Sequence, residues 1–312
     1  MEQHQDIKFS IVIPTYNRAQ LIAKTLRSVK NQSYSNFEAI IVDNCSTDNT
    51  HEVLLPFLED KRFRYIRNDR NYERGYSRNV GMSVATGDYL TLLDSDDLVS
   101  DNFLQSAANY IVNNSYDIFH NLYVMMNGRD EIIYKYSFPP VEKAIPSIAE
   151  GNFLSCIGVF ISKKIYSFYR FDVENDITGV EDWDFWLRIL AVYPLGRIEE
   201  VNSFIIDHAD RTVRDIGLAN SVLAKKNTVI AKIVADRNLH ETYGSYLDRM
   251  YACTYLYAAS LANDNHEVNV ALASLLKAAL KDWRMIFTKR FLVIVAKAFS
   301  LSHIIWQKEK VY

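Results

Sequence analysis

Cysteine is scarce in this 312-residue chain: only Cys45, Cys156 and Cys253 are present, far apart and odd in number. Such usage argues against a disulfide framework and against a zinc site, and it favours the reducing cytoplasm. Uncharged apolar runs of about 18 residues are also absent, so we expect no membrane-spanning helix. The opening stretch MEQHQDIKFSIVIP lacks an apolar segment of signal-peptide length, so we expect no leader.

Strong charge of one sign is lacking as well. The formal net charge of −3 gives the chain no general attraction to nucleic acid. Hydrophobic residues make up 49% of the chain and charged residues 23%, which is typical of a globular protein rather than a disordered one. A chain of this length can bury one large core or two smaller ones.

The first 115 residues alternate between two hydrophobic periodicities. Short apolar runs predict strands at 9–14, 37–44, 63–68 and 88–94. Apolar residues at helical spacing predict helices at 19–32, 46–58, 76–86 and 100–114. Strands that alternate with helices of this length predict right-handed crossovers and an α/β fold with a Rossmann-like, mostly parallel sheet.

Glycine is missing from the loop after the first predicted strand, PTYNRAQL at residues 14–21. Dinucleotide-binding enzymes of alternating fold carry GxGxxG at this point, where glycines let the backbone approach the pyrophosphate. The sequence therefore argues against a dinucleotide-dependent oxidoreductase.

Polar and acidic residues follow three of the predicted strands: PTYNR the first, VDNCSTD the second and LDSDD the fourth. Ligands of parallel sheets collect at the carboxyl ends of the strands. A single polar strand end is typical of any surface loop. Three of them at one edge favour a binding site.

The stretch LLDSDD, residues 92–97, ends a buried strand in three carboxylates. Asp94 and Asp96 are two residues apart, so in extended backbone both side chains point to one side. Two such carboxylates, with water and phosphate oxygens, suit a hard divalent cation. The same string is also common in solvated turns and helix caps, and Asp97 is a candidate cap.

From about residue 116 the pattern changes. Residues 116–138 predict two strands around an Asn127-Gly128 turn, 159–169 a strand entering a helix, 181–194 a helix and 196–207 a strand. Beyond Asp215 the chain predicts helices at about 217–238, 241–263, 266–281 and 285–306. We expect two regions, 1–216 and 217–312, of which the second is helical.

Four stretches, in order, resemble the motif series of family 2 glycosyltransferases of GT-A fold: IVIPTYNR, IIVDNCSTDNT, NYERGYSRNVGMSVATGDYLTLLDSDD and EDWDFWLR. The resemblance covers roughly residues 9–215 and makes 1–216 the nucleotide-sugar transferase domain. It implies an inverting enzyme that uses Mn²⁺ or Mg²⁺ and moves a hexose or N-acetylhexosamine from a UDP-sugar. The implied acceptor is a hydroxyl of a bacterial glycan or of a lipid-linked saccharide.

The resemblance assigns donor binding to Pro14, Thr15, Tyr16, Arg18, Asp43, Asn71, Gly75, Arg78, Asp94, Ser95, Arg211 and Arg214. Residues 14–16 match the loop that lines the nucleobase. Arg18 matches a residue that reaches the phosphate or the ribose of the donor. Asp43 matches an aspartate that accepts the uracil N3–H, a donor that cytosine lacks. Gly75 would let the backbone approach the ligand, and Arg78 would contact phosphate or sugar.

The same resemblance assigns Asp94 to the ribose and Asp96 to the metal. In DHADRTVR, residues 207–214, His208 matches a further metal ligand, and Arg211 and Arg214 match diphosphate contacts. Ile206 stands where the family commonly has an arginine two residues before the histidine. A lone histidine at a strand exit is equally typical of a structural role, and both interpretations stay open.

Asp182 resembles the catalytic base of the family, which takes the proton of the attacking acceptor hydroxyl. Glu181 and Trp183, its neighbours, are assigned to the acceptor. Acids at the start of a helix also serve simply to compensate the helix dipole, which contributes about 0.3–1 kcal/mol. A non-catalytic nucleotide- or sugar-binding module of the same fold is the alternative function, against which the joint presence of Asp94, Asp96 and Asp182 argues.

The C-terminal residues 277–312 contain eight basic and two acidic residues, a net charge of +6. On a helical projection of 289–308 the basic residues share one broad side and apolar residues cover the other, except that Val293 and Ile304 fall on the polar side. This pattern is typical of a helix packed on its own protein or on an oligomer partner. It equally suits an anionic membrane surface. We therefore expect a cytoplasmic protein, with peripheral attachment to the inner face of the cell membrane and homo-oligomerisation left open.

Overall fold

The computed structural model describes residues 7–174, 176–208 and 219–309, the last nine of these by their backbone alone. The described residues form two compact units that interleave along the chain. The first unit contains 7–144, 153–174 and 184–208, and the second contains 145–152, 176–183 and 219–309. The sequence predicted one division, near residue 216.

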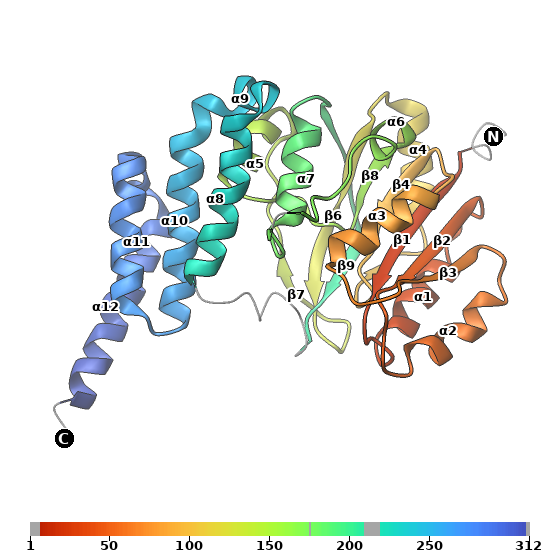
Figure 1. Cartoon of the computed structure of the whole chain (residues 1–312), viewed down its shortest axis with the longest axis horizontal. Helices are drawn as coiled ribbons and strands as arrows, with labels where there is room; N and C mark the ends of the chain where they lie inside the picture. The colour runs from red at the N-terminus through yellow and green to blue at the C-terminus, as the bar shows by residue number, and fades with distance from the viewer. Residues whose placement is uncertain (1–6, 175, 209–218, 310–312) are drawn as a thin grey trace. The chain divides into compact units, whose positions relative to one another are not determined.

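A single mixed sheet of nine strands runs through the described part of the first unit, in the order β3-β2-β1-β4-β8-β6-β9-β5 with β7 beside β6. The strands are β1 (Phe9–Thr15), β2 (Phe37–Asp43), β3 (Phe63–Arg67), β4 (Tyr89–Leu92), β5 (Leu98–Val99), β6 (Ile118–Met126), β7 (Ile132–Lys135), β8 (Val159–Ser162) and β9 (Leu195–Ile206). Strands β1–β4 are all parallel, and β6 and β9 point the same way (Figure 1). The mostly parallel α/β sheet is as predicted.

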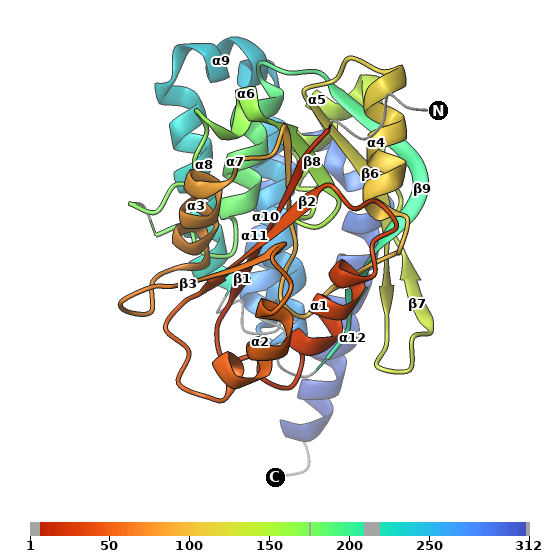
Figure 2. The same ribbon diagram turned by 90° about the vertical axis from the view of Figure 1, so that its right-hand side faces the viewer.

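Helices cover both faces of the parallel strands. They are α1 (Ile22–Lys30), α2 (Thr50–Leu58), α3 (Arg74–Val84) and α4 (Phe103–Asn113). Figure 2 shows α3 on one face of β1–β3 and α1 and α2 on the other. Smaller elements of this unit are η1 (Val141–Lys143) and α6 (Lys163–Tyr166), and α7 (Glu181–Leu190) contributes all but its first three residues.

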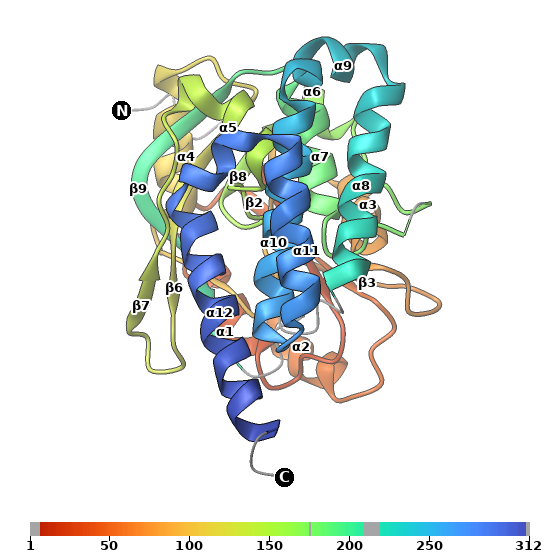
Figure 3. The same cartoon turned by 90° about the vertical axis from the view of Figure 1, so that its left-hand side faces the viewer.

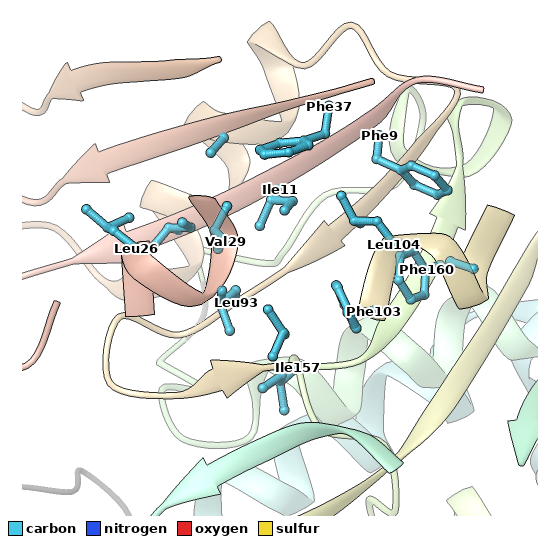
Figure 4. Close-up of a cluster of buried hydrophobic side chains, with 14 of the residues drawn as sticks. Phe9, Ile11, Leu26, Val29, Phe37, Leu93, Phe103, Leu104, Ile157 and Phe160 are labelled. Carbon is cyan, nitrogen blue, oxygen red and sulfur yellow. The ribbon is translucent and has the colours of Figure 1, made fainter. Parts of the chain in front are cut away.

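The alternation of side chains along β1 explains this two-sided cover. Phe9 and Ile11 point into a cluster that also takes Leu26 of α1 and Leu104 of α4 (Figure 4). Val12, the residue after Ile11, points to the opposite side and faces α3. Helix α3 can approach so closely only because residue 81 is glycine: a Cβ there would lie 2.3 Å from Val12 Cγ1.

The carboxyl ends of the parallel strands meet at one edge of the sheet. In the register of β1, β2 and β3, Thr15 lies beside Asp43 and Asp43 beside Arg67. Beyond β4, the backbone N–H of Leu93 still donates to the carbonyl of Val12 at 3.0 Å. The loop residues that follow these strands are therefore gathered at this edge, which is where the sequence predicted a binding site.

The second unit is a helical bundle with the short helix α5 (Ala144–Glu150), of which all but Ala144 belong to this unit. Its other helices are α8 (Ala219–Ala235), α9 (Arg237–Tyr243), η3 (Gly244–Tyr246), α10 (Leu247–Asp264), α11 (Val268–Lys281), η4 (Trp283–Phe287) and α12 (Lys289–Glu309). Helix α10 packs against α8, α11 and α12 (Figure 3). The predicted helical region is confirmed, but the single helix predicted over 241–263 begins instead as α9 and turns at Gly244–Tyr246 before α10. Nowhere in the described part of the chain does a helix combine the length and apolarity needed to span a bilayer.

Candidate active site

The loops after β1 and β2 are joined by hydrogen bonds. The backbone N–H of Asn17 donates to Ser46 Oγ at 3.0 Å, and Asn17 Oδ1 accepts from the backbone N–H of Thr47 at 2.8 Å. Asp48 Oδ2 accepts from the backbone N–H of Ala19 at 3.1 Å. Asn17 has a φ of 49°, a left-handed conformation that asparagine tolerates better than most residues. These two predicted nucleotide-binding loops therefore form one structure.

Of the first-loop residues assigned to the donor, Thr15 is buried, Pro14 is half-buried and Tyr16 is 39% exposed. Tyr16 thus presents its ring to solvent at the edge of the sheet where the strands end. Asn17 and Asp48 were quoted within motifs, but the sequence did not assign them their roles in joining the loops.

Asp43 ends β2 with no solvent-exposed surface. Its Oδ1 accepts from the backbone N–H of Ser46 at 2.8 Å, and its Oδ2 accepts from the hydroxyl of Tyr65 at 2.7 Å. Burial, together with this bond to a carboxylate, raises the pKa of the Tyr65 hydroxyl. An ionised carboxylate has about four acceptor sites, so two donors leave it capacity for a third.

An amide cluster fixes the loop between β3 and α3. Asn44 Oδ1 accepts from Asn68 Nδ2 at 2.9 Å and from the backbone N–H of Tyr72 at 3.0 Å. Asn44 Nδ2 donates to Asn71 Oδ1 at 2.7 Å. Asn71, assigned to the donor from sequence, is thus exposed but held in place by Asn44. The sequence reasoning missed Asn44, for which a polar residue directly after a buried strand was the available signal.

Each acid of the LLDSDD stretch has its own partner. Arg78, 2% exposed and lying over the ring of Phe171, donates to Asp94 Oδ1 at 3.0 Å. Asp97 Oδ1 accepts from the backbone N–H of Ile206 at 2.9 Å. The burial of Arg78 makes it a support for Asp94, and its predicted direct contact with the donor stays a prediction.

The carboxylate of Asp96 lies close to an imidazole and a guanidinium group. His208 Nε2 lies 3.1 Å from Asp96 Oδ2, and Arg18 Nε lies 3.4 Å from the same oxygen. The side chains of Asp96 and His208 are 18% and 14% exposed. His208 Nδ1 is buried and has no hydrogen-bond partner among the residues that the structure describes. Residues assigned to the metal on separate motifs, 112 positions apart, are thus brought together.

The local backbone at this point differs from what the sequence predicted. Residues 95 and 96 form a turn, closed by a hydrogen bond from the backbone N–H of Asp97 to the carbonyl of Asp94 at 3.1 Å. The alternation expected for extended backbone therefore does not apply to Asp94 and Asp96. A carboxylate and an imidazole side by side are ligand types that suit Mn²⁺. Among the described residues no three acidic, histidine or cysteine side chains form a metal-binding group.

Ser95 and Gly75 have packing roles that the sequence did not reveal. Ser95 is buried and its carbonyl accepts from Thr25 Oγ1 of α1 at 3.0 Å. A Cβ on Gly75 would lie 3.2 Å from Cβ of Phe171, so glycine lets α3 pack on that residue. Their assignment to the donor stays a prediction. Arg211 and Arg214 lie outside the described residues.

In the second unit, Asp182 stands in the first turn of α7. Its Oδ2 accepts from Asn152 Nδ2 at 2.9 Å and its Oδ1 from the backbone N–H of Trp183 at 2.8 Å. Glu181, buried, accepts from the backbone N–H of Gly179 at 2.5 Å through Oε2. Trp183 is buried, and its indole N–H donates to the carbonyl of Ile148 at 2.7 Å. The acceptor roles predicted for Glu181 and Trp183 remain predictions beside these structural ones.

Lys226 of α8 is a further charged neighbour of Asp182. Its Nζ lies 4.0 Å from the ring centre of Trp183 and 5.4 Å from that of Tyr257. Burial lowers the pKa of Lys226 to about 8, and the charge of Asp182 acts in the opposite direction. No motif of the sequence indicated this lysine, because a single lysine in an amphipathic helix is normally a solvated residue.

Comparison with protein families gives a match of residues 10–178 to the model described as glycosyl transferase family 2. An uncharacterized glycosyltransferase of Rickettsia bellii is 27% identical over 216 residues, which is 67% of this chain but 30% of that protein. The chain thus spans about a third of the length of that relative. A protein of Escherichia coli named UDP-Glc:alpha-D-GlcNAc-diphosphoundecaprenol beta-1,3-glucosyltransferase WfgD is 26% identical over 185 residues, 59% of this chain and 70% of that protein.

Two solved structures share the fold. The structure of S. aureus TarS residues 1–349 in complex with UDP-GlcNAc has a TM-score of 0.67 at 17% identity and covers 95% of this chain and 89% of that one. The mannosyltransferase PcManGT from Pyrobaculum calidifontis, in complex with GDP-Man and Mn²⁺, has a TM-score of 0.59 at 15% identity. That match covers 94% of this chain and 85% of that one. The fold is therefore GT-A.

Proposed function

The chain belongs to glycosyl transferase family 2, and on that basis we propose that this glycosyltransferase is inverting and metal-dependent, with a UDP-sugar as donor. The sugar moved is a hexose or an N-acetylhexosamine, and the acceptor is a hydroxyl of a bacterial glycan or a lipid-linked saccharide. The observation that carries the proposal is the pairing of Asp96 with His208 at 3.1 Å. Two residues that the family resemblance assigned to one metal ion come from distant motifs and meet at the edge of the sheet.

The donor is bound along the strand ends of the first unit. Tyr16 offers an exposed ring to the base, and Asp43 accepts the uracil N3–H at an acceptor site that Ser46 and Tyr65 leave open. Asp94, oriented by Arg78, accepts from ribose hydroxyls. Arg18, whose Nε lies 3.4 Å from Asp96 Oδ2, would supply positive charge to the diphosphate.

Asp96 and His208 would hold a Mn²⁺ or Mg²⁺ ion, with diphosphate oxygens and water as the other ligands. When bound, the ion neutralises charge that grows on the departing diphosphate. The atoms that would face the ion are Asp96 Oδ2 and His208 Nε2.

Asp182 acts as the base. It takes the proton of the acceptor hydroxyl that attacks the anomeric carbon, and inversion requires only this one base. Asn152 and the backbone N–H of Trp183 hold one carboxylate oxygen each, so the group is oriented before the acceptor arrives. Lys226 adds a positive charge beside a carboxylate that must be ionised to work.

The bacterial relatives support the acceptor class. The printed name of the E. coli relative describes transfer to a diphosphoundecaprenol-linked sugar, an acceptor of the lipid-linked kind. With such an acceptor, the enzyme works at the inner face of the cell membrane as a peripheral protein.

The test is a screen of donor turnover. The purified chain is incubated with Mn²⁺ and with UDP-Glc, UDP-Gal, UDP-GlcNAc, UDP-GalNAc or GDP-mannose. The release of the nucleoside diphosphate, UDP or GDP, is then measured. We expect release from one or two UDP-sugars, lost in excess EDTA and in Asp96→Asn. Turnover of GDP-mannose alone would overturn the uridine assignment. Tight nucleotide binding without turnover of any donor, with or without saccharide acceptors, would favour a binding module.

A further inference from the structure

Helix α11 of the second unit exposes a stripe of leucines. Its buried residues Ala271, Leu275 and Ala278 face α10. Leu276 and Leu280, one turn apart on another side, are 62% and 77% exposed. Isolated exposed leucines are common on protein surfaces, but the two elements that follow α11 in the chain expose large apolar side chains as well.

The next element, η4, adds two exposed aromatic side chains. Trp283 is 67% exposed and Phe287 is 70% exposed, and their ring centres are 6.0 Å apart. The element is nevertheless fixed, because Met285 between them is buried and Asp282 bonds both Arg249 and Arg284. The two rings are therefore held outward by an anchored turn.

The first half of α12 also exposes apolar side chains. Leu292 and Phe299, seven residues and so two turns apart, are 56% and 62% exposed, and Val293 is 55% exposed. Helices α11 and α12 contact each other and both contact η4 (Figure 3). We call the set Leu276, Leu280, Trp283, Phe287, Leu292, Val293 and Phe299 the apolar tail surface.

The charge around the apolar tail surface is segregated from that of the rest of the chain. Residues 268–300 contain six basic residues and one acid, a net charge of +5, whereas the other 279 residues carry −8 of the total of −3. The one acid, Asp282, has a side chain only 3% exposed and is paired with two arginines. Lys281 and Lys297 form exposed pairs with Asp248 and Asp264 of α10, a kind of pair weak enough to exchange for another anion.

We propose that the apolar tail surface docks onto the surface of an anionic phospholipid bilayer. Leucines and aromatic rings enter the headgroup region while the surrounding lysines and arginines meet lipid phosphates. A second copy of the chain fits less well, because a two-fold interface would bring the same basic side chains face to face. Nucleic acid would pair with the basic side chains, but it would leave the aliphatic side chains of this surface uncovered.

This surface differs from the one that the sequence indicated. The projection of the C-terminal helix placed the membrane contact on α12 alone, whereas the exposed apolar side chains begin on α11 and centre on Trp283 and Phe287. Only the choice of a bacterial membrane rests on the proposed function, since the binding itself needs neither donor nor acceptor.

The experiment is cosedimentation of the full chain with vesicles at low salt. Vesicles of phosphatidylcholine mixed with phosphatidylglycerol are compared with vesicles of phosphatidylcholine alone. We expect binding to the anionic vesicles only, weakened by added salt. Trp283→Ser with Phe287→Ser should reduce binding at least about tenfold, since two interfacial side chains are lost. Lys277→Gln with Lys289→Gln should reduce it about tenfold through lost charge.

The matched control is Phe168→Ser, which removes an aromatic side chain that is 83% exposed in the first unit and should leave vesicle binding unchanged. Circular dichroism and UDP binding check that every variant is folded. Absence of vesicle binding by the intact chain, or equal binding by the Trp283/Phe287 variant, overturns the proposal. A dimer in light scattering that only this variant dissociates would show that a second copy covers the surface. Loss of sugar transfer with vesicle binding retained would instead count against the proposed function.

Discussion

Asp43 provides the sharpest test of the nucleotide assignment, because the structure shows it already engaged. Replacing it with alanine removes the acceptor of two hydrogen bonds, from the Ser46 backbone N–H and the Tyr65 hydroxyl. The buried Ser46 N–H left without a partner costs about 1–3 kcal/mol, and the lost bond from the half-buried Tyr65 hydroxyl about 0.5–1.5 kcal/mol, so the free energy of unfolding should fall by about 1.5–4.5 kcal/mol. If Asp43 also accepts the uracil N3–H, UDP affinity falls separately by about 1.5–3 kcal/mol, or roughly 10- to 150-fold.

Tyr65→Phe separates the two effects. It removes the hydrogen bond to Asp43 Oδ2 and keeps the carboxylate, so it should destabilise the fold by about 1 kcal/mol without loss of UDP affinity. Chemical denaturation measures stability, and calorimetric titration with UDP and CDP, at a temperature where both variants are folded, measures preference. We expect the intact chain and Tyr65→Phe to prefer UDP. Equal affinity of the intact chain for UDP and CDP would refute the reasoning, as would loss of the preference in Tyr65→Phe.

Three further results are expected. Asp182→Asn should fold and bind UDP but lose transfer by about 10²–10⁴-fold; transfer at the native rate would move the base elsewhere, with Glu181 the first residue to test. Asp96→Asn should abolish the Mn²⁺ dependence of UDP affinity in the same titration, and an unchanged Mn²⁺ effect would rule out a metal ligand at this position. Gly81→Ala, whose Cβ would lie 2.3 Å from Val12, should lower the free energy of unfolding by about 1–3 kcal/mol. Gly128→Ala, with no atom within 4 Å of its Cβ, is the control and should change stability by less than about 0.5 kcal/mol.

The fold was predictable where the local spacing of hydrophobic residues reflects which side chains are buried. The alternation of Phe9 and Ile11 with Val12 predicts a strand covered on both faces, and the polar residues after Thr15 and Asp43 correctly indicate one edge of the sheet. The turn at Gly244–Tyr246 escaped prediction because apolar residues continue through it at helical spacing.

The site was predictable as a set of residues but less so as a set of contacts. Asp94 is paired with a buried arginine 16 residues earlier and Asp96 with a histidine 112 residues later, and no local pattern encodes either distance. The turn at residues 95 and 96 also replaces the alternation on which the sequence argument relied. Side-chain pairing depends on how the strands and loops meet in space, which one sequence does not record.

The joining of the first two loops has a practical meaning for changing the nucleotide that the enzyme accepts. A graft of a relative's first loop alone would remove Asn17 Oδ1, the acceptor of the Thr47 backbone N–H, wherever the relative has another residue at this position. The conformation of the grafted loop would still depend on Ser46 and Asp48 of the second loop, which accept from the backbone N–H groups of residues 17 and 19. Residues 14–19 and 44–50 therefore behave as one exchangeable cassette, and libraries that vary donor preference should recombine the two loops only as a pair from the same parent.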